Sequence, residues 1–123
     1  MAFDWRPLMG RITAAFRQEL GENLTGIYLH GSAAFGSMSE GSDLDFIAVT
    51  ERPPTQEQKE HLIAALLQLE REAPAKGLEM SVVLLQDSRN FLYPTPYQLH
   101  YSPMHRRAFE QDLSGYCRRM QGV

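Results

Sequence analysis

The sequence predicts a domain of the α/β (α+β) class, with helices packed on a small mixed β-sheet. Apolar residues recur at helical spacing over residues 6–20 and again over 55–72. Three short runs rich in Val, Ile and Leu, at residues 24–30, 43–50 and 78–85, have the length of buried strands. The resulting order, helix, strand, turn, strand, helix, strand, is typical of a layered domain that buries one face of its sheet under helices.

The first predicted helix covers residues 6–20. Its apolar residues lie three or four positions apart, at Leu8, Ile12, Ala15, Phe16 and Leu20. Pro7 fits the first turn of a helix, where no backbone N–H is required, and Gly21 fits the position just after its end. The two signals therefore bound this helix on both sides.

The second predicted helix begins after Thr55, because Thr55 and Gln58 have the spacing of a capping box. We expect it to run to about Glu72, before Pro74 and Gly77. Its apolar face consists of Leu62, Leu66 and Leu69, with Ile63 and Leu67 beside them.

The C-terminal third is less regular. Residues 91–101 are aromatic and contain two prolines, so they are either an edge strand or an ordered loop. Ser102 followed by Pro103 is typical of a helix start. One helix, or two short helices broken near Asp112–Gly115, is expected to fill the remainder.

Composition indicates one soluble domain spanning residues 1–123. The chain is 43% hydrophobic and 22% charged, which is ordinary for a globular protein. A net charge of −3 argues against broad nucleic-acid binding, which usually needs a basic face. Cys117 has no second cysteine to pair with, so a reducing cytoplasm is the expected location. No segment has the features of a signal peptide or a membrane span, and no membrane partner is expected.

The segment between the first two strands carries the clearest functional pattern. Gly31 and Ser32 follow the first strand, and a turn of small residues leads to Asp43 and Asp45 at the start of the second. Residues two apart on a strand share a face, so the two carboxylates project together and repel each other. A magnesium ion relieves that repulsion, because Mg²⁺ prefers oxygen ligands and shares them with phosphates. An ordinary hairpin is the alternative, but it would not explain a second carboxylate inside an apolar strand.

This pattern resembles the signature of the nucleotidyltransferase (polymerase beta-like) superfamily. That signature is Gly-Ser or Gly-Gly, a spacer of roughly ten residues, then Asp-x-Asp between apolar positions; here the spacer is Ala33 to Ser42. The aromatic run at residues 91–102 resembles a segment of the streptomycin/spectinomycin-type aminoglycoside adenylyltransferases. The resemblance implies a nucleotidyltransferase fold and transfer of AMP from ATP to a hydroxyl, with release of pyrophosphate. An aminoglycoside acceptor, and hence antibiotic resistance, is the first expectation.

Glu79 is the expected third carboxylate. A charge in the third strand is unusual because the rest of that strand has the residues of a buried strand, although an exposed position at the strand end would also explain it. By resemblance, the acidic residue on this strand faces the aspartate pair and accepts the proton of the attacking hydroxyl. Asp43, Asp45 and Glu79 are therefore the predicted catalytic and metal-binding residues, with one or two Mg²⁺ ions.

The predicted nucleotide contacts lie on both sides of the turn. Backbone N–H groups at Gly31 and Ser32 can hold phosphate oxygens. Ser42 either contacts phosphate as well or caps the turn beside Asp43.

Two other functions remain open. Minimal nucleotidyltransferases of similar length act as antitoxins that adenylylate a partner protein on tyrosine, and an inactive fragment that binds nucleotide or a partner is the second alternative. The adenylyltransferases that the chain resembles usually continue into a helical C-terminal domain, which we expect to be absent here. A homodimer could then supply the missing wall of the cleft.

Overall fold

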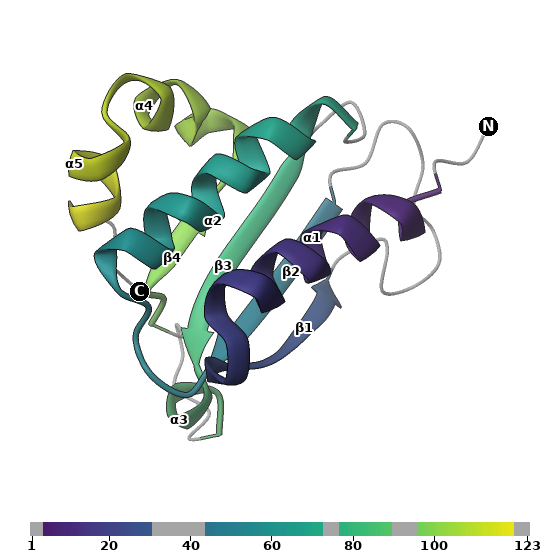
Figure 1. The fold of residues 1–123 in the computed structure, drawn as a ribbon, viewed down its shortest axis with the longest axis vertical. Helices are drawn as coiled ribbons and strands as arrows, with labels where there is room; N and C mark the ends of the chain where they lie inside the picture. Colours follow the sequence, from purple (N-terminus) through teal and green to yellow (C-terminus); the bar gives the residue numbers. More distant parts are fainter. Residues whose placement is uncertain (1–3, 31–43, 73–76, 90–95, 120–123) are drawn as a thin grey trace.

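The computed structural model describes residues 4–30, 44–72, 77–89 and 96–119. The predicted class is confirmed, because helices pack on a four-stranded mixed sheet (Figure 1). The strands are β1 (Leu24–His30), β2 (Leu44–Thr50), β3 (Leu78–Leu84) and β4 (Leu99–Tyr101), in that order across the sheet. β1 and β4 are antiparallel to their neighbours, whereas β2 and β3 are parallel.

Two helices cover one face of this sheet. α1 (Arg6–Leu20) and α2 (Gln56–Leu69) run side by side across it (Figure 1). They bury the side chains that alternate along β2 and β3, namely Leu44, Phe46, Ala48, Leu78, Met80 and Val82. The crossover between the parallel strands contains α2 and the short 3₁₀ helix η3 (Glu70–Glu72), as parallel pairing requires.

The predicted start of α2 and the predicted end of α1 are confirmed, whereas α2 itself ends at Leu69 and the expected last turn to Glu72 is the 3₁₀ helix η3. Thr55 Oγ1 accepts a hydrogen bond from the N–H of Gln58, and the Gln58 side chain accepts one from the N–H of Thr55, which completes the capping box. At the end of α1, Gly21 has φ of 57°, a conformation that favours glycine. The 3₁₀ helix η1 (Gly21–Asn23) then leads into β1.

The C-terminal part corrects two details. The strand expected to reach residue 85 ends at Leu84, where the unpredicted helix α3 (Leu85–Arg89) begins. Ser102 precedes the 3₁₀ helix η4 (Pro103–His105), but its hydroxyl does not cap it. The Ser102 Oγ instead lies 2.7 Å from His105 Nδ1. A hydrogen bond between the two side chains therefore takes the place of the cap.

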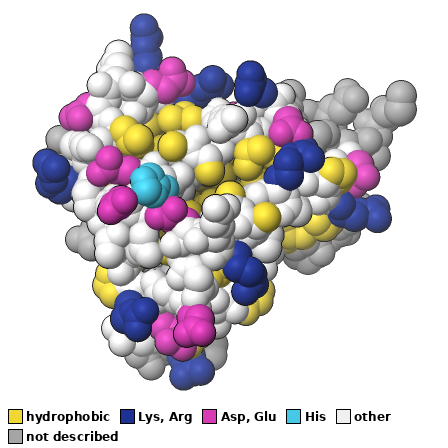
Figure 2. Space-filling model, in the orientation of Figure 1, with side chains coloured by type: hydrophobic (Ala, Val, Ile, Leu, Met, Phe, Trp, Pro, Cys, Tyr) yellow, Lys and Arg dark blue, Asp and Glu magenta, His cyan; other side chains and the backbone are white. Residues whose placement is uncertain are grey.

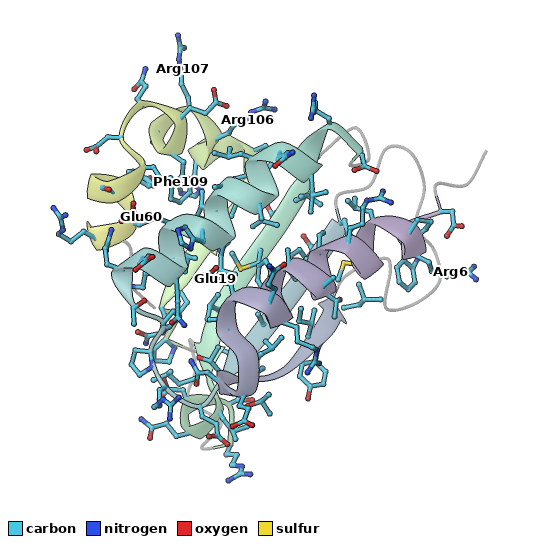
Figure 3. All side chains as sticks on the ribbon, viewed as in Figure 1. Arg6, Glu19, Glu60, Arg106, Arg107 and Phe109 are labelled. Carbon is cyan, nitrogen blue, oxygen red and sulfur yellow. The ribbon has the colours of Figure 1, made fainter. Side chains whose placement is uncertain are left out.

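The predicted break near residue 112 is confirmed. α4 (Arg106–Gln111) and α5 (Leu113–Arg119) meet at Asp112, whose Oδ1 accepts a hydrogen bond from the N–H of Gly115. Phe109 points inward from α4 (Figure 3) and is buried against Tyr101 of β4. Cys117 is fully buried, and burial raises the pKa of its thiol to about 11, so it is not a reactive nucleophile. Across the described ranges, no helix is long and apolar enough to span a bilayer.

An ion pair between α1 and α2 makes a testable contribution to stability. His61 Nδ1 lies 2.8 Å from Glu19 Oε1, and Figure 2 shows a histidine among acidic side chains on this helical face. The hydrogen bond to Glu19, helped by the charges of Glu19, Glu57 and Glu60, raises the pKa of His61 above its ordinary value of 6.5. The folded state therefore binds this proton more tightly than the unfolded state does.

We expect the stability that His61 contributes to be complete below the unfolded pKa and to disappear as the pH rises through the raised folded pKa. His61→Gln should then lower the urea midpoint more at about pH 5.5 than at about pH 9. Equal losses at the two pH values would show that the protonated ring does not stabilise the helix pair.

Candidate active site

Asp45 and Glu79 are brought together by the parallel pairing of β2 and β3. They are register partners, so their side chains stand on the same face of strands that lie about 4.8 Å apart. Both alternate with buried neighbours, Phe46 after Asp45 and Met80 after Glu79, whose side chains pack under the helices. The core therefore fixes the two carboxylates on the opposite face of the sheet.

Gly77 holds the starts of the two strands together. Its carbonyl accepts a hydrogen bond of 3.0 Å from the N–H of Leu44, the residue before Asp45. Its φ of 84° favours glycine, and a Cβ there would lie 2.6 Å from Pro103 Cγ. The glycine thus permits the close approach of Pro103 at the start of β3, and the register of β2 and β3 then sets Glu79 beside Asp45.

The two carboxylates share a pocket of about 330 Å³. Its lining consists of Asp45, Phe46, Ile47, Glu79, Met80, Ser81 and His100. Asp45 and Glu79 are partly buried, and the Oδ1 atom of Asp45 is fully buried. Two carboxylates at one partly buried site repel each other, and a bound cation relieves that repulsion. Their oxygens match the ligands that Mg²⁺ prefers, so the two described carboxylates of the predicted metal site fit such an ion.

The other predicted site residues, Gly31, Ser32, Ser42 and Asp43, lie outside the described residues. Their roles stay predictions. Among the residues that the structure describes, no group of three acidic, histidine or cysteine side chains is placed to hold a metal ion. A predicted set of three carboxylates would need Asp43 as well as Asp45 and Glu79.

Ser81 and His100 form a polar wall of the pocket that sequence analysis missed. They are register partners on β3 and β4, and Ser81 Oγ lies 2.9 Å from His100 Nδ1. Burial lowers the pKa of His100 below its ordinary value; the charge of His105 lowers it further, and the charge of Glu79 acts in the opposite direction. The imidazole is therefore mostly neutral near pH 7.

The sequence gives only a short signal for the position of His100, the alternation of three residues in β4. Leu99 and Tyr101 are fully buried, so alternation places His100 on the opposite face of β4. Only the pairing of β4 with β3 shows that this face is the one that carries Glu79.

Comparison with known proteins gives three results. The family model described as a nucleotidyltransferase domain matches residues 11–113. Spectinomycin 9-adenylyltransferase of Enterococcus faecalis is 25% identical over 107 residues, which cover 84% of this chain and 42% of that protein. The crystal structure of the spectinomycin adenyltransferase of the same organism, with ATP and spectinomycin, superposes with a TM-score of 0.76 at 24% identity, covering 87% of this chain and 45% of that one.

These matches agree with the sequence resemblance. The structural match confirms the predicted fold, and the family match covers Asp45, Glu79, Ser81 and His100. The chain spans less than half the length of each of these relatives.

Proposed function

Because this chain belongs to the nucleotidyltransferase domain family, we propose that it transfers AMP from ATP to a hydroxyl group and releases pyrophosphate. The observation that carries the proposal is the Asp45–Glu79 pair, two carboxylates from neighbouring parallel strands facing one pocket. A relative that was crystallised with ATP and spectinomycin supports the nucleotide and suggests the acceptor. An aminoglycoside-like, polyhydroxylated acceptor is therefore our first candidate.

In this mechanism the acceptor oxygen bonds to the α-phosphorus of ATP while the bond from that phosphorus to the pyrophosphate oxygen breaks. Glu79 accepts the proton that the hydroxyl loses. Its place in the pocket puts this base next to Asp45, the carboxylate that would hold the metal. Holding the acceptor and the phosphate together in one pocket contributes further to the rate enhancement.

Magnesium is the cofactor that these residues suit. Asp45 and Glu79, joined by Asp43, would hold one or two Mg²⁺ ions through carboxylate oxygens. Bound there, Mg²⁺ would offset the negative charge of the triphosphate and of the departing pyrophosphate. The N–H groups of Gly31 and Ser32, with Ser42, would hold the remaining phosphate oxygens. ATP and Mg²⁺ are both plentiful in the cytoplasm, which is the location that we propose.

The test is incubation of the full chain with Mg²⁺, labelled ATP and a panel of aminoglycosides that includes spectinomycin and streptomycin. We expect an adenylylated aminoglycoside by mass spectrometry and no product when EDTA removes the metal. Calorimetric titration of ATP with and without Mg²⁺ accompanies the assay. A chain that neither forms product nor binds ATP in a metal-dependent way would contradict the proposal. If a partner protein were labelled on tyrosine and no aminoglycoside were labelled, the acceptor would be that protein instead of an aminoglycoside.

A further inference from the structure

The edge strand β4 contributes one side chain to the pocket, and that side chain has no part in the proposed transfer. His100 lies across from Ser81, on the face of the sheet that carries Asp45 and Glu79. Along β3, Ser81 follows Glu79 by two residues, which is about 7 Å of strand. Asp45 lies on the β2 side of Glu79, whereas the Ser81–His100 pair lies farther along β3 and across on β4.

The His100 ring is held in one orientation. Its Nδ1 is 2.9 Å from Ser81 Oγ. The ring of Tyr97 is tilted against it at 5.6 Å between centroids, and the ring of His105 meets it edge to face at 5.4 Å. His105 is itself bonded through Nδ1 to Ser102 Oγ. Because Ser81 occupies Nδ1, a molecule in the pocket would meet the Nε2 of His100 and the Ser81 hydroxyl.

This pair has the chemistry of a site for alcohols. A neutral imidazole and a hydroxyl each donate and accept hydrogen bonds, as a sugar-like hydroxyl group does. Burial, which keeps the pKa of His100 low, favours the neutral form. A cationic ring would instead favour an anionic ligand such as phosphate.

We propose that Ser81 and His100 bind a second hydroxyl of a polyhydroxylated acceptor while its reacting hydroxyl lies at Glu79. The inference rests on the proposed transfer of AMP to a hydroxyl, and it makes His100 a positioning residue, with no proton-transfer role. A cross-strand bond that only stabilises β4 is the competing explanation. That explanation predicts a loss of stability without any change in acceptor binding.

The test compares wild type with His100→Leu, His100→Gln and Ser81→Ala in the full chain, using spectinomycin and Mg²⁺–ATP. His100→Leu should raise the KM for spectinomycin about tenfold, the loss expected for one hydrogen bond, while the KM for ATP stays within about twofold. His100→Gln, which keeps a donor and an acceptor, should recover part of the affinity. His61→Gln, a histidine on the helical face, is the matched control and should leave both constants unchanged.

A second measurement does not depend on turnover. The imidazole signals of the histidines are followed by NMR as spectinomycin is added with Mg²⁺ and a non-hydrolysable ATP analogue. We expect the His100 signals, assigned with His100→Gln, to shift and those of His61 to stay in place. Transfer by the wild type with unchanged KM values in His100→Leu would overturn this inference and leave the proposed function standing. A shift of His100 without any transfer would support acceptor binding and contradict the enzyme assignment, and no shift and no transfer would overturn both.

Discussion

Replacing Glu79 with glutamine is expected to lower the rate of AMP transfer by about 10²- to 10⁴-fold without unfolding the protein. Glutamine has the shape of glutamate but cannot take a proton from the attacking hydroxyl. The side chain lines the pocket and is only partly buried, between Leu78 and Met80, which belong to the core. The chemistry should therefore be lost while the packing of β3 stays intact. Steady-state kcat measures the loss of rate, and the far-ultraviolet circular dichroism spectrum of the same sample shows whether the fold is intact.

Asp45→Asn tests the metal-holding role of its partner across the parallel pair. We expect a similar loss of rate together with a higher Mg²⁺ concentration for half-maximal activity, because one charged oxygen ligand is removed. Glu22→Gln is the control, because it makes the same exchange of a carboxylate for a carboxamide at an exposed position in η1. This variant should retain activity. If Glu79→Gln transferred AMP at the wild-type rate, Glu79 would not be the base. If both site variants unfolded, the carboxylates would have a structural role instead.

Much of the fold could be predicted because its signals are local. The capping box at Thr55 and Gln58 and the stop at Gly21 depend on residues within one turn of each other. The period of the apolar residues identified α1, α2 and the first three strands. Glu79 was predicted by resemblance, and in the structure alternation agrees with that choice, because Leu78 and Met80 on either side of it are buried.

The remaining features depend on contacts between distant parts of the chain. β4 has three residues, too few for a period of two to be visible, and it becomes a strand by pairing with β3. His100 therefore joins the site through a partner that lies 19 residues away in the sequence. Ser102 has the residue type of a helix cap, but its hydroxyl bonds the side chain of His105. A local rule cannot weigh such a competing side-chain partner.

Phe46→Ala is expected to have the largest effect on stability, a loss of about 3–5 kcal/mol in the free energy of unfolding. Phe46 is 2% exposed, and its ring meets that of Phe16 of α1 edge to face at 5.8 Å between centroids. Truncation would remove this aromatic contact and leave a cavity between the helix and β2. The residue also lies directly after Asp45, so its packing keeps the carboxylate on the opposite face of the strand. Urea unfolding followed by circular dichroism measures the loss.

Tyr28→Ala is the matched control on the neighbouring strand. Tyr28 is paired in register with Ile47, beside Phe46, but its side chain is 56% exposed on the other face. Its truncation removes one cross-strand contact and should cost about 1 kcal/mol or less. The difference between the two variants isolates burial against α1 from the loss of an aromatic ring on a strand. Equal losses would mean that the helix–sheet interface does not hold β2 in place, and the orientation of Asp45 would then need a different physical cause.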